Sequence, residues 1–431
     1  MSATSRYDVG LGVNTIIVPG SSAGVLETAK AGAITGKTIF VSPGEYSGTN
    51  LLKNGVSWDF ATGAVLTDVR TTEGSTFDDS PTGANGAIVG MIGGMGELVY
   101  DGTYDNEEGT GEKCNVLFLT NTGSNLTVQC TELRNERDVE FTRQSQSTVR
   151  QTAGTLHLTA ERILTNCGSA IWWDDGPCWV NAQRIEATDA TDGVGGVYVS
   201  LPDTASTGDL YVTAQLITAA GGAAITVIPT AIGNASRVWI DCLDIRAGGR
   251  GIDVQAGFVY VTGQRLRAGN IAVNMVAGEL WLTVQKVLVD MSGGRGLYLQ
   301  GGESHLQFED VEEIATGANR MIECTGGTHI IKGMRWVGGA STAGILVSGG
   351  TLILENCYIN TSANAGTSPI SKSGGTIILD GCTLIAEGTQ DSITASTAQN
   401  VKIYGTTFAN KTVNVNVTIQ VGTLVVGASV T

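Results

Sequence analysis

The sequence predicts an all-β fold, a single-stranded right-handed parallel β-helix with three short strands in each coil. Three observations predict it. A segment of ten residues is repeated along the chain, apolar residues alternate with polar ones inside each repeat, and glycine supplies 60 of the 431 residues. No apolar period of 3.6 residues is sustained, so long helices are not expected. A solenoid can absorb the whole chain as one domain.

The repeat consists of eleven segments that align without gaps, and successive starts lie 21 to 32 residues apart. Counting each start as position zero, positions two and four are mostly aliphatic and predict a strand with one buried face. Position six is mostly small, which suits a tight bend, and position nine is apolar again. A further strand precedes each start. The starts are Gly154, Gly176, Gly208, Ser236, Gly257, Gly278, Gly302, Gly327, Gly350, Gly375 and Gln399.

The N-terminal part of the chain departs from this pattern. Residues 22–33 predict a short amphipathic helix that covers the open end of the apolar column. We therefore expect an N-terminal cap helix and first strands over 1–53, irregular first coils with inserted loops over 54–153, and regular coils over 154–431.

Several segments resemble one known group of proteins. A short helix is followed by a strand ending in PGEY, then by NGVSWDF, and then by coils of the type GTLILENC. This order is similar to the pectin-lyase-like right-handed parallel β-helix proteins, which include phage tailspikes and other virion proteins. The resemblance covers nearly the whole chain and implies the fold. It leaves function open, because this fold hosts lyases, hydrolases, adhesins and spikes.

Composition narrows the classes of function. The net charge of −16 disfavours binding to nucleic acid, because an acidic surface repels phosphates. No apolar run is long enough for a membrane span, and the N-terminus lacks the pattern of a signal peptide. The eight cysteines form no CxxC pair and the three histidines are far apart. We therefore expect no metal, no cofactor and free core thiols.

The paired aspartates Asp174 and Asp175 are the candidate catalytic residues. The resemblance implies this, because polygalacturonase-like hydrolases carry a paired Asp, although their NTD, GHG and RIK motifs are missing here. Long loops follow the pair in the next coils, and Asp203 in one of them is a third candidate acid or base. The alternative is an ordinary turn, since Asp-Asp-Gly is also a turn sequence.

Position three, which lies between two inward positions, is aromatic in seven successive repeats. With strands ~4.8 Å apart, these rungs form an outward stripe ~29 Å long. Such a stripe packs against another chain, stacks sugar rings, or is shielded by its own neighbours. We count Trp172 with this candidate binding surface because it lies close to the paired aspartates. The stripe contains His157, Trp179, Tyr211, Trp239, Tyr260, Trp281 and His305, and Ile330, Ile353 and Ile378 extend it.

The sequence thus favours a virion or extracellular surface protein of the tail-fibre, tailspike or decoration type, made in the cytoplasm without a signal peptide. We expect it to form a homo-oligomer, with a trimer favoured, or to bind other virion proteins or a cell-surface polysaccharide. The first alternative is a polysaccharide depolymerase, a glycoside hydrolase or lyase acting near residues 172–239. The second is an adhesin that binds carbohydrate without cleaving it.

Overall fold

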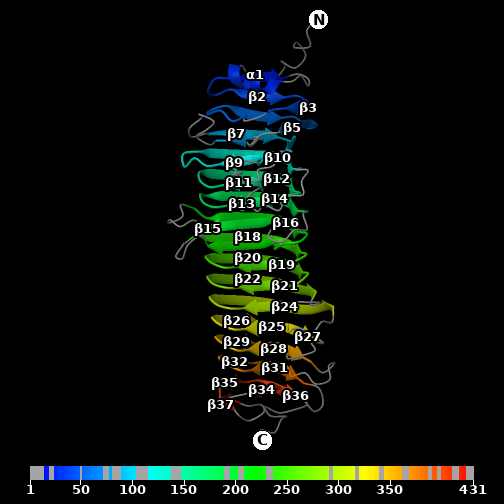
Figure 1. Cartoon of the computed structure of the whole chain (residues 1–431), viewed down its shortest axis with the longest axis vertical. Coiled ribbons are helices and arrows are strands. Elements are labelled where there is room, and N and C mark those ends of the chain that lie inside the picture. The colour runs from blue at the N-terminus through cyan, green and yellow to red at the C-terminus, as the bar shows by residue number, and fades with distance from the viewer. Residues whose placement is uncertain are drawn as a thin grey trace. The chain divides into compact units, whose positions relative to one another are not determined.

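The computed structural model describes residues 14–18, 24–48, 51–70, 77–79, 89–102, 115–136, 147–188, 195–201, 208–229, 236–290, 295–315, 320–338, 344–361, 368–386, 391–395, 399–409 and 417–423. The chain divides into two compact units, Met1–Gly221 and Gly222–Thr431. Each unit is a right-handed parallel β-solenoid made almost entirely of strands (Figure 1). The predicted all-β parallel β-helix is confirmed at this level. The predicted division after residues 53 and 153 stays a prediction.

Unit 1 is the N-terminal unit, Met1–Gly221. Its helix α1 (Val25–Gly32) lies within the predicted helical segment. The strands form two parallel sheets, which we name sheet A and sheet B. Sheet A contains β1 (Thr15–Val18), β2 (Thr38–Val41), β3 (Gly44–Ser47), β4 (Ser57–Phe60), β5 (Ala64–Arg70), β7 (Val89–Gly94), β8 (Glu97–Gly102), β10 (Asn125–Asn135), β12 (Thr155–Thr165), β14 (Cys178–Ala187) and β16 (Leu210–Ala219). Sheet B contains β6 (Phe77–Asp78), β9 (Leu117–Leu119), β11 (Ser147–Gln151), β13 (Ser169–Trp173) and β15 (Val197–Leu201).

Unit 2 repeats this arrangement with its own strands. Its sheet A contains β18 (Arg237–Ala247), β20 (Phe258–Ala268), β22 (Glu279–Asp290), β24 (Glu303–Ala315), β26 (Thr328–Lys332), β27 (Arg335–Val337), β29 (Thr351–Glu355), β30 (Tyr358–Asn360), β32 (Thr376–Asp380), β33 (Thr383–Ile385), β35 (Gln399–Tyr404), β36 (Thr407–Ala409) and β37 (Val417–Thr423). Its sheet B contains β17 (Ile225–Pro229), β19 (Arg250–Val254), β21 (Ile271–Met275), β23 (Leu297–Leu299), β25 (Ile322–Cys324), β28 (Ile345–Val347), β31 (Ile370–Lys372) and β34 (Ile393–Ala395).

The long strands of sheet A are fused from two shorter ones. In unit 1, the first half of β10 pairs with β7 and its second half pairs with β8. In unit 2, β24 pairs in the same way with β26 and then β27. All these pairs are parallel and keep their register from coil to coil, so residues at one repeat position stack in columns.

The columns predicted to face inward are buried. At position nine, Ile163, Ile185 and Ile217 of unit 1 have no exposed surface, and neither has Ile245 of unit 2. Strand geometry explains this, because side chains two residues apart point to the same face of the sheet. Burial of these aliphatic columns is the main stabilising contribution within each unit.

Position six differs between the coils whose sheet A strands are fused and the coils in which that strand is split in two. In unit 1, Ala160 is buried inside the continuous strand β12, so its small size fills the core and marks no separate bend. In the split coils of unit 2, the same position has a positive φ, as at Gly333 and Gly381. Asn356 also occupies it with φ 53°, and asparagine tolerates this left-handed conformation better than most residues.

A second glycine column occurs at position zero of unit 2. Gly350 has φ 65°, and a Cβ placed there would lie 2.4 Å from the carbonyl carbon of Gly326 in the preceding coil. Gly327 and Gly375 combine a positive φ with an equally close backbone neighbour. Both restrictions favour glycine at the corner where each new coil begins.

Two polar residues interrupt the inward column at position two of unit 2. Ser304 and His329 are in register on adjacent coils, and both are completely buried. Ser304 Oγ lies 2.9 Å from His329 Nδ1, while His329 Nε2 lies 2.8 Å from the carbonyl oxygen of Gly326. A neutral imidazole satisfies both contacts when Nε2–H donates to the carbonyl and Nδ1 accepts from the hydroxyl. Burial lowers the pKa of His329 below its ordinary value of 6.5.

This buried imidazole predicts a loss of stability in mild acid. Because the pKa of His329 is lower in the folded than in the unfolded chain, the neutral ring stabilises the fold fully above about pH 6.5. That contribution is lost as the pH falls toward the folded pKa. We expect the free energy of unfolding to drop between pH 7.5 and 5.5. His329→Gln, which does not titrate, should remove most of this drop in denaturation curves, and an equally steep drop in the variant would contradict the assignment.

The cysteines that the structure describes are buried and free. Cys357 and Cys382 follow each other at position seven of adjacent coils, and both are reduced, as the sequence predicts. Burial also raises the pKa of Cys130 to about 12, so its thiol is unreactive near neutral pH. Cys114 lies outside the described residues.

Candidate functional site: an aromatic ladder and a buried arginine–aspartate pair

The predicted aromatic stripe is present on sheet A of unit 1 as a stack of parallel rings. His157, Trp179 and Tyr211 are in register on β12, β14 and β16, and all three side chains are exposed. The ring centroids of His157 and Trp179 are 4.4 Å apart, and those of Trp179 and Tyr211 are 5.9 Å apart. The planes differ by only 3° and 4°.

Unit 2 carries a second stack of the same kind, which we call the aromatic ladder: Trp239, Tyr260, Trp281 and His305. The ring centroids are 3.9 Å apart between Trp239 and Tyr260, 6.5 Å between Tyr260 and Trp281, and 3.8 Å between Trp281 and His305. Trp239 and Trp281 keep 36% and 42% of their surface exposed. Ile330, Ile353 and Ile378 continue the same position in register and are half-buried.

The stacking decides which part of each ring a partner can touch. In the ladder the rings stack closely in two pairs, Trp239 with Tyr260 and Trp281 with His305, so one face of each ring is covered. The 6.5 Å between the centroids of Tyr260 and Trp281 leaves too little room for a sugar ring between them, and the ring edges point outward. A sugar ring binds an aromatic side chain by lying flat on its face, so the inner rungs offer poor sugar platforms. The rings therefore shield part of each other's faces but leave their edges exposed. These edges suit contact with another protein surface.

Acidic side chains hold the polar edges of several rings. In the ladder, Trp281 Nε1 donates to Glu279, and His305 Nε2 lies 2.9 Å from Glu303 Oε1. In unit 1, the Tyr211 hydroxyl donates to Asp209 over 3.3 Å. Each acid lies two residues before its ring, on the same face of the strand. The exposed face is thus both aromatic and acidic.

Trp172 does not belong to either stack, because it lies on sheet B. It is in register with Arg150 on β11 and with Tyr198 on β15. The guanidinium carbon of Arg150 lies 4.8 Å from the centroid of Trp172 and 5.7 Å from that of Phe118. The rings of Trp172 and Tyr198 are 4.5 Å apart and tilted by 52°. Trp172 thus lies outside the aromatic stripe and stacks with a buried cation, and its place in the candidate binding surface stays a prediction.

Asp174 completes this cluster at the end of β13. Its carboxylate accepts a hydrogen bond of 2.8 Å from Trp172 Nε1, and Oδ2 lies 3.6 Å from Arg150 Nε. Burial raises the pKa of Asp174, although the charge of Arg150 and hydrogen bonds from Trp172 and Ser200 oppose that rise. Arg150 itself is 8% exposed, and within the described part of the chain its Nε and Nη1 lie beyond ordinary hydrogen-bond distance of an acceptor. The cluster therefore contains a carboxyl group that protonates more readily than usual.

The other two candidate acids do not join it on the described surface. Asp175 Oδ1 accepts a hydrogen bond of 2.6 Å from the amide of Gly176, whose φ is 88°. This is the turn that an Asp-Gly sequence commonly forms. Asp203 lies outside the described residues. Of the predicted catalytic pair, Asp174 lies against Arg150 and Trp172, and Asp175 lies in the turn that follows.

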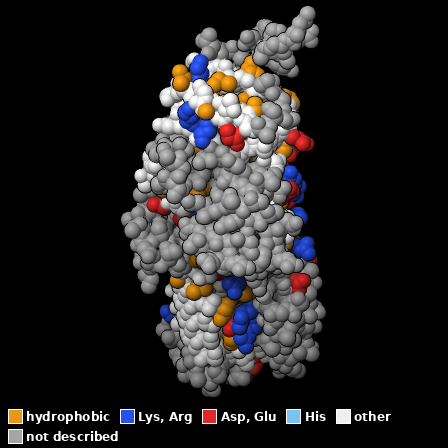
Figure 2. All heavy atoms as spheres, turned by 45° about the horizontal axis from the view of Figure 1, so that its top comes forward, with side chains coloured by type: hydrophobic (Ala, Val, Ile, Leu, Met, Phe, Trp, Pro, Cys, Tyr) orange, Lys and Arg blue, Asp and Glu red, His pale blue; other side chains and the backbone are white. Residues whose placement is uncertain are grey.

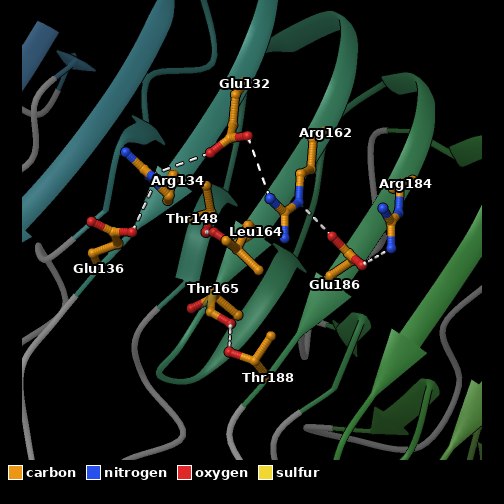
Figure 3. A network of polar contacts seen from close by, with 10 residues as sticks. All are labelled: Glu132, Arg134, Glu136, Thr148, Arg162, Leu164, Thr165, Arg184, Glu186 and Thr188. Atoms are coloured by element: carbon orange, nitrogen blue, oxygen red, sulfur yellow. Dashed lines mark hydrogen bonds and ion pairs between the residues drawn. The ribbon is translucent and has the colours of Figure 1, made fainter. Parts of the chain in front are cut away.

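Cross-coil ion pairs line the second half of the sheet A strands in unit 1. Glu132 on β10, Arg162 on β12 and Glu186 on β14 alternate in sign along the stack, and Arg162 pairs with both acids (Figure 3). Arg134 and Arg184 pair with Glu132 and Glu186 from the same strands. Figure 2 shows described charges of both signs in small groups with neutral surface between them. Glu132 and Arg162 lie in register and favour it, whereas the like charges Arg162 and Arg184, which also lie in register, share the carboxylate of Glu186.

The first strand of each repeat does not contain the cluster around Arg150. Aligning the strand that precedes each start reveals it, since STVRQ, SAIWW and GGVYV place Arg150, Trp172 and Tyr198 in one column. The same alignment in unit 2 places Asp253 beside Asn274, whose amide donates to the aspartate over 2.7 Å.

No helix in the described ranges is long and apolar enough to cross a membrane. Within those ranges, no three acidic, histidine or cysteine side chains gather as a metal site.

Comparisons with protein-family models, with curated proteins and with solved structures give no match.

Proposed function

We propose that this chain is a surface or virion attachment protein that works as an oligomer and uses the aromatic face of sheet A as its contact surface. The observation that carries the proposal is the ladder of parallel rings with exposed edges on unit 2. Such a run of partly exposed aromatic side chains is unfavourable in water, and a partner that covers it removes that cost. Tryptophan and tyrosine also contribute strongly to protein–protein binding.

The resemblance of PGEY, NGVSWDF and the GTLILENC-type coils to virion β-helix proteins supports the same proposal. The homotrimer and the surface location rest on that resemblance and on the exposed face. A carbohydrate adhesin is less well supported, because the rings of the ladder cover one face of each other in two pairs and the space between Tyr260 and Trp281 is too small for a sugar ring.

The double change Trp239→Ser with Trp281→Ser tests the proposed contact surface. It removes two ring edges and one ring–acid hydrogen bond, so we expect the oligomer to dissociate into monomers at micromolar concentration. Light scattering coupled to size-exclusion chromatography measures the mass. Val276→Ser with Val337→Ser is the matched control, because both valines are exposed apolar residues outside the ladder. A monomeric wild-type protein, or a ladder variant that stays oligomeric, would count against the proposal.

A polysaccharide depolymerase is the second candidate, and the perturbed carboxyl group of Asp174 favours it. A glycosidase needs a protonated carboxyl group as acid, and a raised pKa provides one nearer neutral pH. Assaying the wild-type protein and the Asp174→Asn variant for release of reducing ends from acidic and neutral polysaccharides distinguishes this candidate from the first.

We further infer two details of the fold. Each coil contains three strands, two in sheet A and one in sheet B, and the two in sheet A are fused in the later coils of unit 1 and in the first coils of unit 2. Helix α1 serves as the cap of unit 1. Buried Leu26 supports this role, as does Lys53 Nζ, which donates to the carbonyl oxygens of Lys30 and Ala33 near the end of the helix.

A further inference from the structure

Like charges stand in register on sheet A of both units. In unit 1, Arg162 lies opposite Arg184, and the carboxylate of Glu186 pairs with both of them. In unit 2, like charges stand in register: Glu279 lies opposite Glu303, and Arg246 lies opposite Arg267. Like charges at adjacent positions of a sheet repel each other, so both columns are unfavourable in the isolated chain.

The first of these columns belongs to what we call the ladder face, the outward side chains in the first halves of β18, β20, β22 and β24. Besides the aromatic ladder, this face carries the acids Asp241, Glu279, Glu303 and Glu309 and the single base Arg237. Asp241, Glu303 and Glu309 are exposed. The ladder face therefore has an excess of negative charge around its aromatic edges.

The second column belongs to an arginine cluster in the second halves of β18 and β20. Arg246 and Arg265 share one carboxylate, that of Asp244, which is buried between them. Arg267 is exposed, and its neighbours in register are Arg246 and Leu288, neither of which can neutralise it. Three guanidinium groups thus face one carboxylate, and the cluster keeps an excess of positive charge.

The two surfaces complement each other and share the same spacing. Both repeat once per coil, because both lie on the same strands, so the rungs of one surface match those of the other when two copies run in parallel. On these strands the rings stand at position three and the arginines at positions eight and ten, which keeps the two surfaces of one chain apart along each strand. Charge complementarity and the common repeat point to a second copy of this chain as the occupant.

We propose that the ladder face of one copy packs against the arginine cluster of the next. This inference rests on the proposed function and names the surface that the ladder meets. The contact joins two different surfaces, so it is heterologous, and repetition around an axis closes a ring such as a trimer. The carboxylate of Asp241 on β18 meets the guanidinium groups of Arg246 on β18 and Arg267 on β20 at the rim, while the ring edges pack in the middle. Arginine suits this role because its planar group also packs against aromatic rings.

Charge reversal tests the pairing. Arg267→Glu and Asp241→Lys should each weaken self-association at least about tenfold, because each sets like charges against each other across the contact. The double variant Arg267→Glu with Asp241→Lys reverses both surfaces together and should return the dissociation constant to within about threefold of wild type. Sedimentation measures the constants at low and high salt, and salt should weaken the wild-type contact.

Glu45→Lys and Arg184→Glu are the matched controls, because they make the same changes of charge on exposed side chains of unit 1. They should alter the dissociation constant less than twofold, and circular dichroism checks that every variant is folded. If the single changes weaken association and the double change fails to restore it, the pairing is wrong. If the ladder double variant dissociates while the charge variants do not, the proposed function stands and this inference falls. A wild-type protein that is monomeric would contradict both the proposed function and this inference.

Discussion

Replacing Trp336 by alanine should lower the free energy of unfolding by about 3–5 kcal/mol. Trp336 occupies the inward position nine of unit 2, has no exposed surface, and lies in register between Val311 and Ile359. Gly338 and Gly344 fit around its ring so closely that a Cβ on either would overlap it. The surrounding coils cannot collapse into the space left by the ring, because their backbones are fixed by pairing on both sides.

The same substitution at Trp239 is the matched control. That side chain is outward and partly exposed, and the change removes mainly its stacking on Tyr260, so we expect a loss of about 1–2 kcal/mol. Urea denaturation followed by circular dichroism, at a concentration where the protein is monomeric, compares the two. Equal losses, or a larger loss at Trp239, would mean that the inward and outward faces of sheet A have been exchanged.

Gly350→Ala should destabilise unit 2 by about 2–5 kcal/mol. Two separate costs contribute to this value. An alanine with φ near 65° is strained, and its Cβ would lie within 2.6 Å of the backbone of Gly326 and Gly327. Neither neighbour can move away, because both take part in the stacked corner of the preceding coil.

Gly36→Ala separates these two costs. Gly36 has φ 85°, but no atom lies within 4 Å of the Cβ that alanine would add, so only the strain remains. We expect a loss of about 1–2 kcal/mol there. Thermal or urea midpoints of the two variants measure the difference. Similar losses at both glycines would show that stacking of the corners contributes little to stability.

The sequence was sufficient to predict the features that depend on alternation along a strand. Leu156, Leu158 and Ile163 are buried as expected, and Trp179 and Trp239 point outward as expected. Their positions follow from the period of two and from the alignment of repeats, which sets the register. The alternation of apolar and polar residues occurs in every repeat. A single exception such as Ser304 therefore does not hide which positions face inward.

Other features depended on information that the repeat does not contain. Alternation places the rings of the ladder outside but does not fix their side-chain angles, so the near-parallel stacking had to come from the structure. The same holds for Arg150 and Asp174, which meet because the carboxylate at the end of one strand reaches the cation of the preceding coil. Position six is a third example, because a small residue there does not reveal its role. Ala160 is small because it packs in the core, whereas Gly333 allows a positive φ.

The parallel register within each unit has a mechanical consequence. Hydrogen bonds between coils point along the stack, whereas the chain runs across it, so a force on the end of the chain separates one coil from its neighbour bond by bond. From Gly350 to Gly375 a coil holds 25 residues, and its release would lengthen the chain by about 80–90 Å. A solenoid of this kind therefore yields to load in repeated steps of one coil, and side contacts between copies would resist each step.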